Sequence, residues 1–113
     1  MDMKEKLKEL GELVKKYGKE QPYRNFAGPF FVFQRKVEEE GVLAGKTKEL
    51  IMIALSIVKQ CEWCVAYHTK TALDLGVKEE EIIETCMVAT VMGGMPAMMY
   101  SQLVLKAIED FKK

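Results

Sequence analysis

The stretch ELIMIALSIVKQCEWCVAYH, residues 49–68, decides the fold of this 113-residue chain. Its first half is apolar on nearly all sides, and its Met, Ala and Leu content favours a buried helix over a buried strand. Residues 46–75 contain neither Gly nor Pro, yet this span exceeds the usual length of a globular helix. The polar cluster at residues 59–62 therefore predicts a break, with a second helix beginning close to Cys61. A helix buried on all sides in so small a domain also predicts a subunit interface.

Two cysteines and the only histidine of the chain follow one another at helical spacing. Cys61, Cys64 and His68 fall along one stripe of a helix. Thiols at positions i and i+3 of a helix place their Cα atoms roughly 5 to 5.5 Å apart, within the range of a disulfide. A helix N-terminus can stabilise the reactive thiolate, and a nearby histidine can accept the thiol proton. The spacing predicts thiol redox chemistry and does not indicate which cysteine attacks first.

Glu49 is the only carboxylate between Glu40 and Glu62. A carboxylate held against an apolar helix can have a raised pKa and can act as a base for a thiol, directly or through His68. The alternative is an ordinary first-turn glutamate that follows Thr47 as the N-cap. The spacing of these residues leaves both interpretations open.

Gly and Pro residues mark the ends of the other predicted helices. An amphipathic first helix stops near Gly18. A segment from Pro22 carries phenylalanines on one face and ends in exposed residues 38–41, and Gly28 and Pro29 interrupt it with either a kink or a division into two shorter pieces. Gly76 ends the Cys-bearing helix, and Gly93 and Gly94 end the next helix, over residues 77–92. Pro96 stands where the last helix can begin. The whole pattern predicts an all-α fold of about five or six helices.

Composition narrows the function classes. The charges of the 17 basic and 17 acidic side chains cancel, so the net charge is zero and we expect neither nucleic acid nor a membrane surface as a partner. The length predicts a single domain over residues 1–113. The charged start, MDMKEKLKEL, does not look like a signal peptide, and residues 50–58 are too few to span a bilayer, so we expect a cytoplasmic protein.

In the reducing cytoplasm, a close pair of cysteines is more often redox-active or metal-binding than structural. A zinc site could use Cys61, Cys64 and His68 with either Cys86 or Glu49, although thiols on a helix do not form the usual zinc knuckle. Covalent haem attachment is excluded, because three residues separate the second cysteine from the histidine. Cys86, among apolar neighbours, is most simply a small core residue.

The spaced residues Glu49, Cys61, Cys64 and His68 resemble the E…CxxCxxxH signature of the AhpD-like superfamily, which includes alkylhydroperoxidase D and the carboxymuconolactone decarboxylase family. The GGMPA stretch, residues 93–97, is similar to a turn and helix start in many members. The likeness covers residues 46–97. Trp63 differs, since it stands where the peroxidase has a second histidine.

The resemblance implies an AhpD-like helical bundle that assembles as a homo-oligomer, a trimer or a hexamer. It implies Cys61 and Cys64 as a redox-active disulfide pair, with Glu49 and His68 as the proton relay and no cofactor. The expected substrates are hydroperoxides or partner disulfides, and the expected electron donor is a lipoyl-type or other dithiol. The alternatives are a cofactor-free decarboxylase or lactone-processing enzyme, and a non-enzymatic helical oligomer with a structural metal site.

Overall fold

The computed structural model describes residues 2–112, and this part of the chain forms five α-helices and no strand. The helices are α1 (Met3–Lys19), α2 (Arg24–Glu38), α3 (Gly45–Val58), α4 (Glu62–Asp74) and α5 (Glu79–Lys112). The predicted all-α fold is therefore confirmed.

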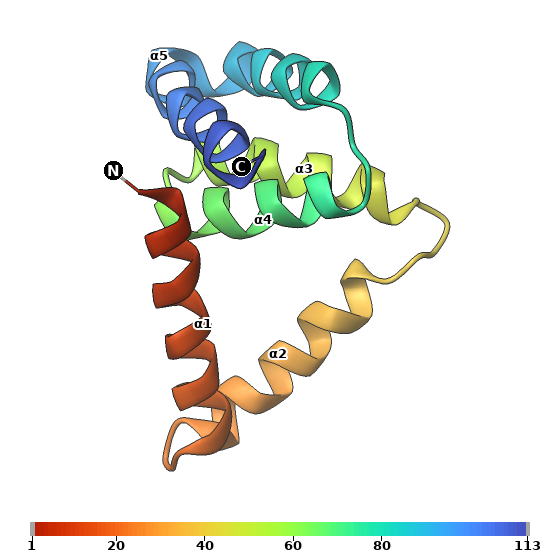
Figure 1. Ribbon diagram of the computed structural model, residues 1–113. Coiled ribbons are helices and arrows are strands. Elements are labelled where there is room, and N and C mark those ends of the chain that lie inside the picture. Colours follow the sequence, from red (N-terminus) through yellow and green to blue (C-terminus); the bar gives the residue numbers. More distant parts are fainter. Residues whose placement is uncertain (1, 113) are drawn as a thin grey trace.

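Helices α3 and α4 form an antiparallel pair, and α5 packs across both (Figure 1). The predicted break between α3 and α4 is present, because Gln60 adopts a left-handed conformation with φ 57° and the chain reverses there. The amide of Cys61 then donates to the carbonyl oxygen of Ser56 at 3.0 Å, which closes the turn. Apolar side chains from all three helices fill the core, including Ile53, Ile57, Val65, Ala66, Ala72, Ile82 and Val104.

Helix α5 consists of two helical halves that meet at Gly94. The backbone of Gly94 has φ 71° and ψ −164°, values outside the helical region, so the predicted division at this glycine is confirmed. By length and composition alone α5 could cross a membrane. However, the helix is broken at Gly94, and each half buries residues against the other helices, Ile82 and Val104 among them.

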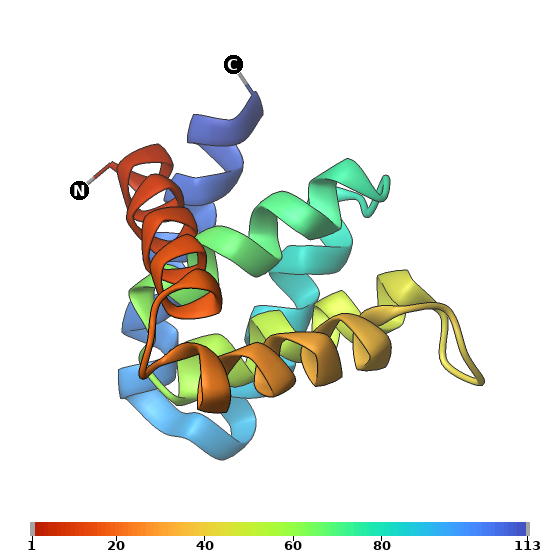
Figure 2. The same ribbon diagram turned by 90° about the horizontal axis from the view of Figure 1, so that it is seen from below.

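Helices α1 and α2 diverge from their short connection and reach opposite ends of the α3–α4 pair (Figures 1 and 2). At the start of α1, Met3 is buried, and its amide donates to a carboxylate oxygen of Asp110 in α5 at 3.1 Å. In contrast, α2 buries no residue, and its phenylalanine face is open to solvent. The expected division into two shorter pieces at Gly28 and Pro29 does not occur, because α2 continues through both residues, and a kink there stays a prediction.

The start and the outer face of α3 differ from the sequence-based expectations. The helix begins at Gly45 after Ala44 as N-cap, so Thr47 lies inside it and does not cap it. Ile51 and Leu55 are about half exposed, so α3 is not buried on all sides within this chain. The outer face of α3 is therefore an exposed apolar surface, and its burial between subunits stays a prediction.

Candidate redox site

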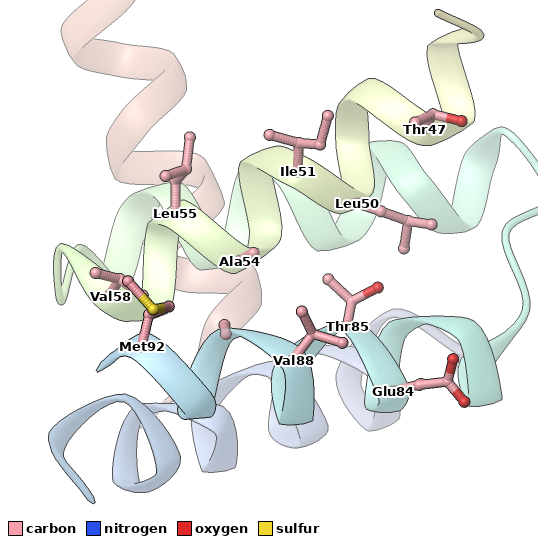
Figure 3. Close-up of a pocket in the computed structure, with 11 residues that line it drawn as sticks. Thr47, Leu50, Ile51, Ala54, Leu55, Val58, Glu84, Thr85, Val88 and Met92 are labelled. Carbon is pink, nitrogen blue, oxygen red and sulfur yellow. The ribbon is translucent and has the colours of Figure 1, made fainter. Parts of the chain in front are cut away.

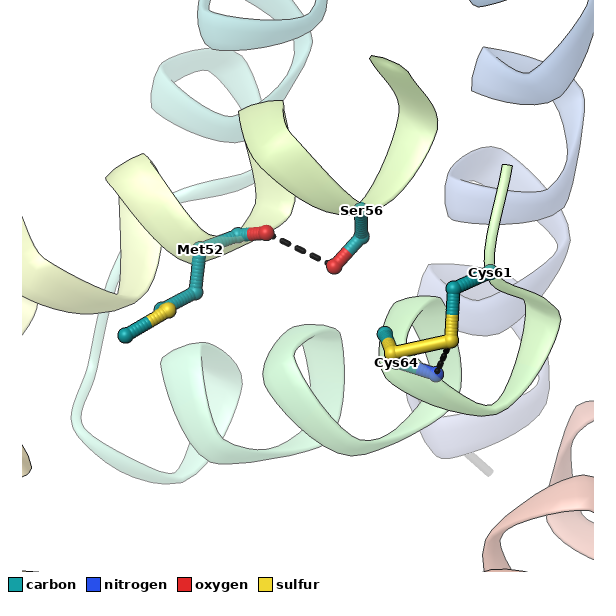
Figure 4. The surroundings of a disulfide bond; sticks show 4 residues. All are labelled: Met52, Ser56, Cys61 and Cys64. Atoms are coloured by element: carbon teal, nitrogen blue, oxygen red, sulfur yellow. Dashed lines mark hydrogen bonds between the residues drawn. A yellow bond between two sulfur atoms is a disulfide. The ribbon is translucent and has the colours of Figure 1, made fainter. Parts of the chain in front are cut away.

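The N-terminus of α4 holds the two cysteines, which are joined in a disulfide (Figure 4). Their Cα atoms lie 5.2 Å apart, as predicted from the i, i+3 spacing. Cys61 is not helical, however. It is the N-cap residue, with extended φ and ψ, and its sulfur accepts a hydrogen bond from the amide of Cys64 at 3.2 Å. A negative charge on this sulfur would therefore be stabilised by a backbone N–H and by the helix dipole.

Ser56 lies beside the disulfide, on the last turn of α3 (Figure 4). It is buried, and its hydroxyl donates to the carbonyl oxygen of Met52 at 2.7 Å. Sequence reasoning did not select this residue, because a serine inside an apolar helix has no distinctive spacing. Its position follows from the antiparallel register of α3 and α4, which brings the end of one helix against the start of the other.

The same register brings Glu49 of α3 to His68 of α4. One carboxylate oxygen of Glu49 lies 2.7 Å from Nδ1 of His68, and both side chains are buried. Since the carboxylate accepts, Nδ1 carries the proton, and Nε2 is the nitrogen left for proton exchange. His68 lies one helical turn after Cys64, so the sulfurs and the imidazole occupy successive turns of α4.

Glu38 joins this pair, although residues 38–41 were predicted to be an exposed helix end. Its side chain is only 12% exposed, and one of its carboxyl oxygens lies 3.9 Å from Nδ1 of His68. Its carboxyl group also hydrogen-bonds with that of Glu49. No local pattern distinguishes Glu38 from the two glutamates that follow it, because its burial depends on how the end of α2 packs against α3.

The pKa values of these two carboxyl groups are shifted in opposite directions. Burial, followed by the hydrogen bond with Glu49, raises the pKa of Glu38 above its ordinary value. Burial also acts to raise the pKa of Glu49, but hydrogen bonds with His68 and Glu38 outweigh it and lower that pKa. The expectation of a raised pKa for Glu49 is therefore wrong, because it considered the apolar helix and not the hydrogen-bond partners. Glu49 is the ionised member of the pair.

Other residues near the site have structural partners. Trp63 points to α1, where its indole N–H donates to Glu9 at 2.9 Å and its ring lies under the ammonium group of Lys6. Cys86 is buried in α5, as predicted, and burial raises the pKa of its thiol to about 11. The zinc site considered from the sequence, Cys61, Cys64 and His68 with either Cys86 or Glu49, does not fit this arrangement, because the sulfurs of Cys61 and Cys64 are bonded to each other.

Donor atoms of Glu38, Glu49 and His68 lie within 4.8 Å of one another, a spacing that a metal ion could also accept. The hydrogen bonds among these three side chains account for their arrangement with protons alone.

A separate groove of about 410 Å³ lies between α3 and the first half of α5 (Figure 3). Leu55, Val58, Val88 and Met92 form its apolar walls, and Glu84 lies at one end. Neither the cysteines nor the Glu49–His68 pair line it. The groove is thus a surface on the outer side of α3, distinct from the redox site.

Comparison with known proteins places this arrangement in context. Residues 30–107 match the carboxymuconolactone decarboxylase family. An uncharacterised protein of Cupriavidus necator is 33% identical over 104 residues, which cover 92% of this chain and 90% of that protein.

Two solved structures are similar over nearly the whole chain. One is a carboxymuconolactone decarboxylase family protein from Legionella pneumophila in its apo form, with a TM-score of 0.90, 35% identity, and coverage of 98% of this chain and 97% of that one. The other, from Thermotoga maritima, has a TM-score of 0.76, 27% identity, and coverage of 96% and 87%. Involvement in an antioxidative response has been suggested for the Thermotoga protein.

Proposed function

This chain belongs to the carboxymuconolactone decarboxylase family within the AhpD-like superfamily, and we propose that it is a thiol-dependent oxidoreductase that reduces hydroperoxides or partner disulfides. The observation that carries the proposal is the Cys61–Cys64 disulfide at the start of α4, together with His68 one turn later, which is buried and hydrogen-bonded to Glu49 of α3. A thiol, an imidazole and an orienting carboxylate form the arrangement that activates nucleophiles in many enzymes.

In the oxidative half-reaction we assign the attack to Cys64, because His68 follows it by one helical turn. Nε2 of His68 takes the thiol proton while Nδ1–H remains bonded to Glu49. The thiolate attacks one peroxide oxygen, the O–O bond breaks, and the departing alkoxide receives the proton from His68. The products are an alcohol and a sulfenic acid on Cys64. Cys61 then attacks this sulfur, so that the disulfide forms and water leaves.

In the reductive half-reaction a dithiol donor, such as a lipoyl-type group, restores the pair. One donor thiolate attacks the sulfur of Cys64, and Cys61 leaves as a thiolate stabilised by the Cys64 amide. The second donor thiol attacks the mixed disulfide, releases Cys64 and closes the donor's own disulfide. Two electrons and two protons pass from donor to protein, and no cofactor is needed. A partner protein's disulfide could replace the hydroperoxide as oxidant.

We also infer that the protein is a homo-oligomer, a trimer or a hexamer, in the cytoplasm. Large apolar side chains are unusually exposed, with Phe26 79% and Met92 92% accessible. Exposed apolar patches of this kind commonly mark protein–protein contacts. The phenylalanine face of α2 and the outer face of α3 together offer such surfaces. Native mass spectrometry tests the inference, since a stable monomer at micromolar concentration would contradict it.

Steady-state consumption of cumene hydroperoxide with dihydrolipoamide as donor tests the proposed activity. We expect turnover by the unaltered protein, and loss of turnover in both Cys61→Ser and Cys64→Ser. Cys86→Ala is the matched control, because its thiol lies outside the site and should not contribute. In Cys61→Ser, one equivalent of hydroperoxide should leave a sulfenic acid on Cys64 that a dimedone probe labels.

Two results would contradict the proposal. One is the absence of hydroperoxide and disulfide reduction by the unaltered protein. The other is activity that survives replacement of both Cys61 and Cys64, which the decarboxylase or lactone-processing alternative predicts.

A further inference from the structure

The end of α2 is held against α3 by one lysine. The ammonium group of Lys48 donates to the carbonyl oxygens of Val37 at 2.7 Å and Glu39 at 2.5 Å, the two residues on either side of Glu38. A cation at this position also complements the negative end of the α2 dipole. The side chain of Glu38 is thus directed to the cluster by its neighbours' backbone, while the rest of α2 buries no residue.

The contacts of Glu38 require a proton. One carboxyl oxygen of Glu38 lies within 4.8 Å of a carboxyl oxygen of Glu49, and a hydrogen bond between the two groups contributes to the raised pKa of Glu38. Glu49 also accepts a hydrogen bond from Nδ1 of His68 at 2.7 Å. Two ionised carboxylates within 4.8 Å of each other in a largely buried cluster would repel each other, so one of them must be protonated. Nδ1–H of His68 lies 2.7 Å from Glu49 but 3.9 Å from Glu38, which favours the ionised form of Glu49, so the proton belongs to Glu38.

We propose that Glu38 is a positioning residue for the proton relay, and that its protonated carboxyl group donates a hydrogen bond to Glu49 and so keeps the Glu49–His68 pair in its working arrangement. The proposal rests on the proposed thiol activity for its kinetic consequence. With Glu38 neutral, the cluster carries one negative charge, on Glu49, when His68 is neutral. The cluster becomes neutral when His68 accepts the proton of a thiol.

The charged and titratable groups around Glu38 agree with this assignment. From α3 they are Glu49 and Lys48, and from α4 they are His68 and Tyr67. Lys48 is bonded to backbone carbonyls, so it does not form an ion pair with Glu38. Burial, and next the hydrogen bond with Glu49, raise the pKa of Glu38, which is the direction that a proton donor requires.

Ionisation of Glu38 would change the relay. As pH rises through its pKa, the hydrogen bond to Glu49 is lost and a second carboxylate charge appears beside the first. The two carboxylates repel, so Glu49 no longer orients His68 and the end of α2 is held mainly by Lys48. We therefore expect thiol oxidation by hydroperoxide to have an alkaline limb that reports the ionisation of Glu38.

Three variants separate a proton-donating role from a purely structural one. Glu38→Gln keeps an N–H donor toward Glu49 but cannot ionise, whereas Glu38→Ala removes the donor. Glu39→Gln is the matched control, because it makes the same change one residue later, where the side chain is exposed and pairs with Lys36. Each protein is first studied in the disulfide form by carbon-13 NMR of the glutamate carboxyl groups across pH.

We expect one carboxyl signal of the unaltered protein to titrate at higher pH than the exposed glutamates. It should disappear in Glu38→Gln and persist in Glu39→Gln. In the reduced proteins, Glu38→Ala should react with hydroperoxide roughly tenfold or more slowly, the size expected when a hydrogen bond to a charged group is lost. Glu38→Gln should keep most of the rate but lose the alkaline limb.

Two outcomes would overturn the inference: a Glu38 carboxyl that titrates with the exposed glutamates, or Glu38→Gln and Glu38→Ala slowed alike with the pH profile unchanged. If the unaltered protein reduces neither a hydroperoxide nor a disulfide, the proposed function fails instead. The carboxyl titration still decides the state of Glu38 in that case, because it requires no activity.

Discussion

Replacement of Glu49 by Gln tests how much the buried carboxylate contributes to thiol activation. The hydrogen bond from Nδ1 of His68 is 2.7 Å long and both side chains are buried, so it belongs to the charge-assisted class. Bonds of this class contribute about 1.5–3 kcal/mol, which corresponds to roughly a 10- to 150-fold change in rate. Glutamine has nearly the same shape but carries no charge. We therefore expect oxidation of the dithiol by hydroperoxide to slow by that factor.

Stopped-flow fluorescence measures this rate directly, because the only tryptophan, Trp63, lies between the two cysteines. Reduced protein is mixed with excess hydroperoxide, and the rate of the fluorescence change is measured at several hydroperoxide concentrations. Glu80→Gln, an exposed glutamate at the start of α5, is the control and should react at the unaltered rate. Circular dichroism verifies that Glu49→Gln remains folded. A folded Glu49→Gln protein that reacts as fast as the control would refute the assigned role.

Three further predictions concern stability and the third thiol. Gly93→Ala should lower the free energy of unfolding by about 1–3 kcal/mol, because a Cβ there would lie 2.6 Å from another side chain. Its control, Gly11→Ala, meets nothing within 4 Å and should raise stability by about 0.5–1 kcal/mol, both measured by urea unfolding. Unfolding across pH should show a maximum. The lowered pKa of Glu49 adds stability that is lost as pH falls below 4.5 through its folded value, whereas the raised pKa of Glu38 adds stability that is lost as pH rises above 4.5 through its folded value. A curve without the upper decline, or one unchanged in Glu38→Gln, would contradict this reasoning. Thiol titration of the reduced native protein should detect two reactive thiols and a protected Cys86, whose pKa is about 11, and rapid labelling of a third thiol would be the contrary result.

Much of the helical framework could be predicted, because its determinants are local. The polar residues before Cys61, the glycine at position 76 and the glycine at position 94 each mark a place where a helix cannot simply continue. The i, i+3 spacing similarly fixed the Cα separation of the cysteines. Such signals depend on a few neighbouring residues and on backbone geometry alone.

The features that were missed depend on contacts between distant segments. The side chain of Glu38 is only 12% exposed because Lys48 holds the end of α2 against α3, and neither residue differs from ordinary surface residues in the sequence. The predicted direction of the pKa shift of Glu49 was wrong for the same reason, because the shift is set by two hydrogen-bond partners on other helices. Which face of α3 its own chain leaves open could not be predicted either, because an apolar sequence does not reveal which side is covered, and the expected subunit interface stays a prediction.

A single-turnover experiment tests the central claim most directly. Fully reduced Cys86→Ala protein is mixed with one equivalent of cumene hydroperoxide, and the protein and the organic product are analysed by mass spectrometry. The account predicts that one equivalent of alcohol forms while the peptide containing residues 61–68 loses two hydrogens and becomes resistant to alkylation. Intact hydroperoxide beside two free thiols would contradict it.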